Sequence, residues 1–132
     1  MAFVLDCSVA LAWLLPDEQS KQADAWADRL QHDTALVPAI WGLQVSNALL
    51  TAVRRKRIRR ADMDQALELL GALPIEIDAL AALHDVLQLA QQSGLTTYDA
   101  SYLELARRRG VPLATLDAQL RKAGLKLSLP QQ

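Results

Sequence analysis

Three aspartates stand where predicted strands end or where a predicted helix begins. Asp6 follows the apolar run 3–5, and Asp117 follows the apolar run 111–116. Asp99 lies in the first turn of a predicted helix. Ligands of open α/β folds gather at the carboxyl ends of the strands, which share one edge of a parallel sheet. Carboxylates that meet there repel one another, and a divalent cation with oxygen ligands, Mg²⁺ or Mn²⁺, offsets that repulsion. Such a metal can promote phosphodiester hydrolysis.

Spacing alone leaves structural roles open for the same residues. Asp99 could stabilise the N-terminus of its helix, and Asp117 could cap a short helix over residues 118–122. Ser8 could likewise cap the helix that follows Asp6. The pattern therefore predicts where a site would lie without deciding whether these groups hold a metal.

The elements that would position these residues alternate between strands and helices. Short apolar runs predict strands at residues 3–5, 35–37, 75–77 and 111–116, with a last edge strand at 125–129. Apolar spacing and capping residues predict helices at 8–15, 20–30, 38–53, 61–70, 79–92, 96–109 and 118–122. This alternation favours an α/β fold with a mainly parallel central sheet and helices on both of its faces.

Composition limits the function classes. The chain has 132 residues, 52% of them hydrophobic, and a net charge of −1, so polyanion binding would need a local basic patch. The run RRKRIRR at 54–60 is either a solvated helix end or such a patch, whereas Arg107–Arg109 suit the negative end of a helix dipole. The single cysteine, Cys7, together with the lack of a signal peptide or membrane span, predicts a cytoplasmic protein with no membrane contact.

An ordered set of motifs resembles the PIN-domain family, and within it the VapC-type toxins. The matching segments are FVLDCSVALAWLL, VPAIWGLQVSNALL, RIRRADMDQALELLGALPIEID and LTTYDASYLELARRRGVPLATLD, which together cover nearly the whole chain. The resemblance implies one PIN domain over residues 1–132 with a three-layer α/β/α fold. It also implies a Mg²⁺- or Mn²⁺-dependent endoribonuclease that cuts RNA such as tRNA, a homodimer, and a cognate antitoxin that blocks the site.

The resemblance also implies roles for individual residues. The family's acidic metal ligands correspond to Asp6, Asp99 and Asp117. Its small polar residues near the metal correspond to Ser8, Asn47 and Thr115. For the homodimer, we expect the interface near the apolar stripe of the middle helix, which comprises Ile40, Trp41, Val45 and Leu49.

One site position departs from the family pattern. Gln44 stands where the family has a glutamate, and it keeps a carbonyl oxygen but loses the negative charge. It cannot act as a carboxylate base, so the alternative to an active enzyme is a weakened or silent domain that binds antitoxin or RNA. A receiver-type phosphorylation domain fits less well, because Asp6 has no acidic neighbour and residues 114–117 contain no lysine.

Overall fold

The fold was obtained as a computed structural model, which describes residues 1–80 and 82–131. Four parallel strands form one sheet in the order β3-β2-β1-β4. The strands are β1 (Ala2–Leu5), β2 (Thr34–Pro38), β3 (Ile75–Asp78) and β4 (Leu113–Ala114). The helices are α1 (Cys7–Leu14), α2 (Lys21–Arg29), α3 (Trp41–Arg54), α4 (Arg60–Gly71), α5 (Leu83–Ser93), α6 (Thr97–Arg109) and α7 (Ala118–Lys126), with a 3₁₀ turn, η1 (Pro16–Glu18).

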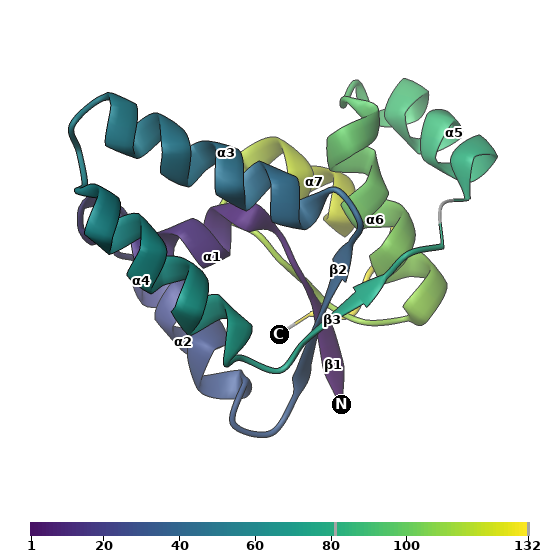
Figure 1. Cartoon of the computed structure of the whole chain (residues 1–132). Coiled ribbons are helices and arrows are strands. Elements are labelled where there is room, and N and C mark those ends of the chain that lie inside the picture. Colours follow the sequence, from purple (N-terminus) through teal and green to yellow (C-terminus); the bar gives the residue numbers. More distant parts are fainter. Residues whose placement is uncertain (81, 132) are drawn as a thin grey trace.

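The helices cover the sheet in two groups. On one face α6 packs against β1, β2 and β4, and α5 and α7 pack against α6; α1, α2, α3 and α4 form the other group (Figure 1). The predicted α/β/α layering is confirmed, and every strand pair that the structure describes is parallel. A helix follows each strand along the chain. The N-termini of α1, α3 and α7 therefore come within a few residues of the ends of strands.

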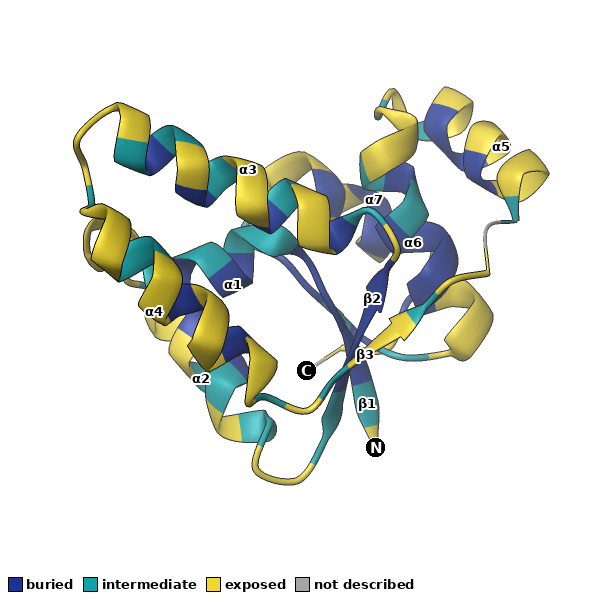
Figure 2. Ribbon diagram, viewed as in Figure 1, coloured by how far each residue is buried: buried dark blue, intermediate teal, exposed yellow. Residues whose placement is uncertain are grey.

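The core follows the burial expected of a parallel sheet that is covered on both faces. Phe3, Val4 and Leu5 of β1 are fully buried, and β2 is buried from Ala35 to Pro38. By contrast β3 lies at the edge and is largely exposed (Figure 2). The residues that follow β1 are thus held by a fully buried part of the sheet.

Several helix ends obey the capping rules used to predict them. Ser20 accepts a hydrogen bond from the Ala23 amide at the start of α2, and Thr96 accepts one from the Asp99 amide at the start of α6. Gly94 and Gly110 end α5 and α6 in the left-handed conformation, with φ of 67° and 64°. These local signals fix the segment that carries Asp99.

Other predicted elements were wrong. The expected edge strand at 125–129 is absent from the described chain, because α7 continues to Lys126 and a turn follows. The strand predicted at 111–116 shortens to Leu113–Ala114, and Pro38 belongs to β2 rather than to the helix after it. The helix predicted at 79–92 begins only at Leu83, and residue 81 of that range lies outside the described residues.

The apolar stripe expected at a dimer interface is used inside the chain. Trp41, Val45 and Leu49 are buried in the core, each less than one-tenth exposed. The exposed large apolar side chains described in this helix are Leu43, at 70%, and Leu50, at 36%, although the sequence context of Leu43 indicated burial. An interface on α3 would therefore use the helix face opposite the predicted stripe.

Candidate functional site

Asp6 is the centre of a hydrogen-bonded cluster that joins the ends of β1 and β4. It is only 4% exposed, and its Oδ2 accepts hydrogen bonds from Ser8 Oγ at 2.7 Å and Thr115 Oγ1 at 2.8 Å. Each hydroxyl oxygen in turn accepts from a backbone amide: Ser8 from Leu116 and Thr115 from Asp117, both at 3.0 Å. Ser8 therefore does not cap α1, and instead it orients the carboxylate and ties it to the loop after β4.

The other two aspartates lie at the starts of helices. Asp117 is exposed and caps α7, because its Oδ1 accepts from the Leu120 amide at 2.9 Å. Asp99 is half-buried in the first turn of α6. Both positions place a negative charge at the positive end of a helix dipole, and this interaction modestly stabilises the helix. The capping role foreseen for Asp117 is thus confirmed.

We define the acidic edge as Asp6, Asp99 and Asp117, and within it the surroundings of Asp6 and Asp99 disfavour the ionised carboxylate. Burial raises the pKa of Asp6 above its usual value; hydrogen bonds from Ser8 and Thr115 oppose that shift, and the charge of Asp117 adds to it. Burial also raises the pKa of Asp99, followed by the charges of Asp6 and Asp117. Within residues 1–80 and 82–131, no Lys, Arg or His forms an ion pair with any of the three.

The donor chemistry of the acidic edge suits a hard divalent cation. All of its side-chain donors are oxygens, and the charges of Asp6 and Asp117 reach Asp99 strongly enough to raise its pKa. In the described chain no group of three or more His, Cys, Asp or Glu side chains is gathered closely enough to hold a metal ion as it stands. What fits a cation is the all-oxygen donor set, because Mg²⁺ is commonly bound through one or two carboxylates and several waters.

Gln44 connects the first turn of α3 to α6. It is half-buried, and its Oε1 accepts a hydrogen bond from the hydroxyl of Tyr102. Tyr102 is fully buried and lies three residues after Asp99, on the same side of α6. Sequence reasoning missed Tyr102, although that spacing from Asp99 was a usable signal. Asn47 lies one turn beyond Gln44, is exposed, and forms no side-chain hydrogen bond with the described residues.

Comparison with known proteins agrees with this fold. The family model described as "PIN domain" matches residues 3–126. The chain belongs to the PIN-domain family. It is 34% identical to "Ribonuclease VapC3" of Pyrobaculum aerophilum over 91% of this chain and 92% of that protein. The resemblance to VapC-type PIN domains that the sequence motifs indicated is confirmed.

Solved PIN structures share the architecture at lower sequence identity. The crystal structure of PAE2754 from Pyrobaculum aerophilum superposes with a TM-score of 0.72 at 20% identity, covering 98% of this chain and 97% of the other. VapBC2 from Rickettsia felis, bound to a DNA fragment from its promoter, gives a TM-score of 0.66 at 13% identity, with 93% of each chain covered. At these identities the likeness concerns the fold.

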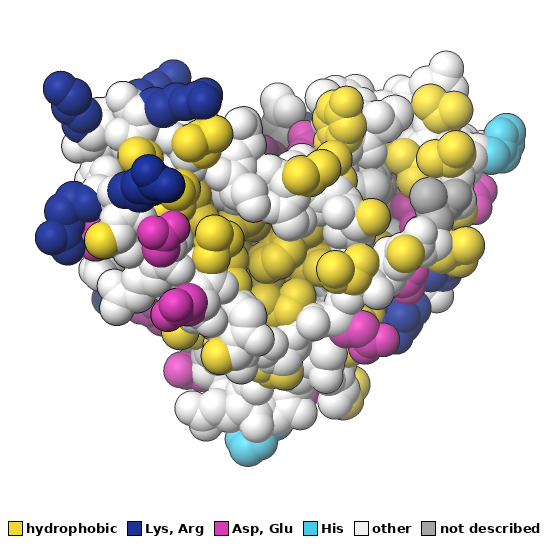
Figure 3. Space-filling view, viewed as in Figure 1, with side chains coloured by type: hydrophobic (Ala, Val, Ile, Leu, Met, Phe, Trp, Pro, Cys, Tyr) yellow, Lys and Arg dark blue, Asp and Glu magenta, His cyan; other side chains and the backbone are white. Residues whose placement is uncertain are grey.

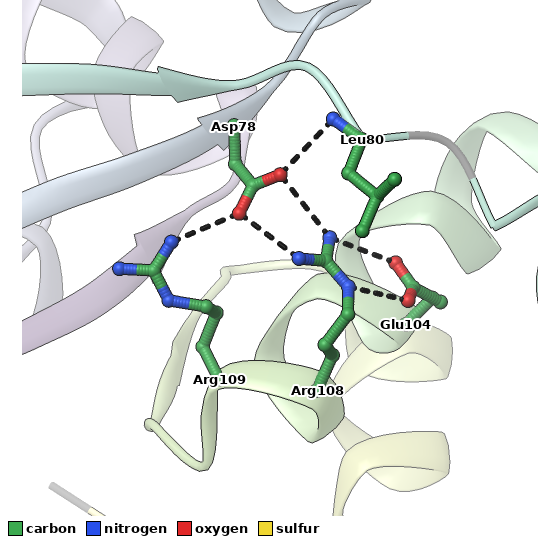
Figure 4. Close-up of polar contacts among 5 residues, drawn as sticks. All are labelled: Asp78, Leu80, Glu104, Arg108 and Arg109. Carbon is green, nitrogen blue, oxygen red and sulfur yellow. Dashed lines mark hydrogen bonds and ion pairs between the residues drawn. The ribbon is translucent and has the colours of Figure 1, made fainter.

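This PIN domain has a second acidic cluster that the sequence did not predict. Asp78 ends β3 and pairs with Arg108 at 3.0 Å and with Arg109 at 2.9 Å (Figure 4). Arg108 also binds Glu104, which is 4% exposed, at 2.8 Å. Arg108 lowers the pKa of Asp78 through its hydrogen bonds, and Arg109 adds to the effect. We call these four residues the Asp78 clamp, because they fasten the edge strand to the last turns of α6.

Proposed function

We propose that this PIN domain, taken as one domain over residues 1–132, is a metal-dependent endoribonuclease toxin of a VapBC-type toxin–antitoxin system. The observation that carries the proposal is the acidic edge, where Asp6 is buried and oriented by two hydroxyls beside two further carboxylates, with no ion pair to a cationic side chain among the described residues. Homology to a protein named as a VapC ribonuclease supplies the reaction class.

In the proposed enzyme, Asp6 and Asp99 hold the cation and Asp117 completes the acidic pocket directly or through water. Mg²⁺ or Mn²⁺ at this position supplies Lewis-acid chemistry for hydrolysis of a phosphodiester. Ser8 and Thr115 keep the Asp6 carboxylate in one orientation, because both donate to the same oxygen. We assign Gln44 to the fourth position as a neutral amide, and the exposed Asn47, one turn further along α3, as a supporting polar group.

RNA would reach the site past a basic tip, which we define as Arg54, Arg55, Lys56 and Arg60. These side chains are exposed where α3 turns into α4, and they gather at the upper left of Figure 3. The neighbouring Arg57 is already paired with Asp17 at 2.7 Å. Gln44 and Arg54 are ten residues apart in α3, so about 15 Å separates them along the helix axis. That span corresponds to roughly four or five stacked nucleotides.

Salt dependence tests the basic tip. Each phosphate neutralised on single-stranded RNA contributes about −0.7 to the slope of log K against log salt. Replacing both Arg54 and Arg55 by alanine should flatten that slope by about 1.4 in fluorescence titrations, while Arg59→Ala, whose guanidinium pairs with Asp62 at 3.0 Å, should leave it unchanged. An equal slope in all three proteins would mean that RNA binds elsewhere.

The partners follow from the same assignment. We infer a cognate antitoxin, as the VapBC2 complex of Rickettsia felis suggests by its name, and a cytoplasmic setting. No helix in the described chain is long and apolar enough to cross a membrane. A homodimer would use exposed apolar side chains such as Leu43 and Ile77, which are 70% and 64% exposed. Light scattering at micromolar concentration should give the mass of a dimer, and a monomer would contradict this inference.

A second candidate function is a silent PIN domain that only binds antitoxin or RNA, and Gln44 is the residue that favours it. Incubation of a single-stranded RNA and of tRNA with Mg²⁺ or Mn²⁺ separates the two functions. We expect cleavage by the natural chain, its abolition by EDTA, and its loss in Asp6→Asn. RNA binding without metal-dependent cleavage, together with cleavage by Gln44→Glu, would establish the silent domain instead.

A further inference from the structure

The hydrogen bond between Tyr102 and Gln44 joins α3 to α6, the helix that carries Asp99 of the acidic edge. Gln44 lies in the first turn of α3, and Tyr102 lies on α6 three residues after Asp99. The Tyr102 side chain is fully buried, so its hydroxyl proton cannot be given to bulk water. Among the described residues, the side chain that accepts this proton is Gln44.

The direction of this hydrogen bond is fixed by the chemistry of its two partners. If the amide were turned so that its nitrogen faced the phenol, the Tyr102 proton would lose its acceptor inside the protein. Burial raises the pKa of Tyr102, and the Cys7 side chain and the charges of Asp6 and Asp99 raise it further, so the phenol keeps its proton. Gln44 Oε1 is therefore committed to Tyr102.

Because Gln44 Oε1 accepts the Tyr102 proton, the amide nitrogen of Gln44 is available for another partner. Nε2 has no hydrogen-bond partner in the part of the chain that the structure describes, and it is not among that part's buried atoms without a partner. It therefore meets solvent at the start of α3. A glutamate would place a second carboxylate oxygen here, whereas Gln44 presents N–H donors, which favour an anionic oxygen.

We propose that Tyr102 is a positioning residue that holds the Gln44 amide so that its nitrogen donates to a phosphate oxygen of bound RNA. This inference rests on the proposed function, since it places RNA beside the acidic edge. In the proposal, Gln44 holds the substrate through its amide nitrogen, whereas the family's glutamate supplies a negative charge at this position. Tyr102 does not touch the RNA and acts only through Gln44.

A double-mutant cycle tests the coupling of the two residues without any cleavage. The probe is a ten-nucleotide single-stranded RNA in EDTA, and the readout is fluorescence anisotropy. Tyr102→Phe keeps the buried ring and removes the hydroxyl, and it should weaken RNA binding by about three- to tenfold. In a Gln44→Ala background the same change should have no further effect. A general structural effect would weaken binding equally in both backgrounds, and that result would overturn the proposal.

Side-chain amide NMR of the natural chain gives a readout that does not depend on any variant of Tyr102. The Gln44 amide resonances, identified by their loss in Gln44→Ala, should shift when the same RNA is added, and Tyr102→Phe should abolish most of that shift. Resonances that do not move in the natural chain would overturn the proposal. If the protein cleaves RNA but the Gln44 amide resonances do not shift when RNA is added, only the positioning role is contradicted. A responsive amide with no metal-dependent cleavage would contradict only the proposed enzyme.

Discussion

Asp6 and Asp78 end two strands of the same parallel sheet, and both are largely shielded from water, yet their surroundings are electrically opposite. Asp78 faces Arg108 and Arg109, and these lower its pKa. Asp6 faces hydroxyls and further carboxylates, and its burial raises its pKa. The position at a strand end is thus shared by a structural acid and a candidate metal ligand. What separates them is whether the chain itself supplies the compensating cation.

This contrast has a physical reason. A buried carboxylate is costly unless it is paired, hydrogen-bonded or bound to a metal. The Asp78 clamp meets that requirement within the fold, because Arg108 and Arg109 pair with Asp78 and so join β3 to α6. The acidic edge meets it only in part, through two hydroxyl donors to Asp6. In the proposed function, a cation from solution would compensate the remaining charge.

The largest effect is expected from breaking the clamp. Arg108→Ala leaves the buried Glu104 without its guanidinium, while Asp78 keeps Arg109. Because Arg108 is itself about one-quarter exposed, we expect a loss of about 2–3 kcal/mol of unfolding free energy, below the full cost of a buried unpaired charge. Urea denaturation measures this loss.

Arg107→Ala is the matched control for that experiment. Arg107 lies on the same turn of α6, is exposed, and forms no ion pair within the described residues. Its replacement should change stability by less than about 0.5 kcal/mol. Equal losses for the two variants would show that the clamp contributes no more than any surface arginine.

A smaller effect is expected from adding charge to the acidic edge. Gln44→Glu keeps an acceptor for Tyr102 and brings a fourth carboxyl group beside the other three. Without metal the variant should be slightly less stable, because like charges repel. With metal it should bind Mn²⁺ more tightly and cleave RNA at least about tenfold faster. Equal metal affinity and equal cleavage rates would mean that a negative charge at residue 44 contributes nothing to metal binding or cleavage.

The smallest effect is a difference in pH dependence between the two clusters. The raised pKa of Asp99 means that its folded form binds a proton more readily, so its contribution to stability falls as pH rises through that pKa. The lowered pKa of Asp78 has the opposite consequence, and its contribution is lost as pH falls below the usual aspartate range. Thermal melts should therefore show that Asp99→Asn stabilises the protein at pH 7 and loses this advantage in acid.

Asp78→Asn should do the reverse in the same melts. It should destabilise the protein at pH 7, and the deficit relative to the natural chain should shrink as pH falls. If both variants showed the same sign at pH 7, the two clusters would not differ in the way proposed.

Local rules predicted the framework of the site better than its contacts. Asp6 and the cap at Thr96 follow from short-range patterns, and the structure places them as expected. The bond between Tyr102 and Gln44 joins residues 58 positions apart, and Arg108 reaches Asp78 across 30 positions. Arg108 was explained by its helix dipole alone, because tertiary ion pairs leave no periodic signal in a sequence. The strand expected at 125–129 was wrong because its alternating leucines do not exclude a helix, and α7 continues through the exposed Leu125 to Lys126.

Titration of Mn²⁺ by calorimetry at pH 7 tests most directly whether the acidic edge is a cation site. The natural chain should bind Mn²⁺, and Asp6→Asn should stay folded and bind it at least about tenfold more weakly. Asp78→Asn removes a charge from the same edge of the sheet but from an acid that is already paired, and it should leave the affinity unchanged. Equal Mn²⁺ binding by the natural chain and by Asp6→Asn would contradict the assignment of this site.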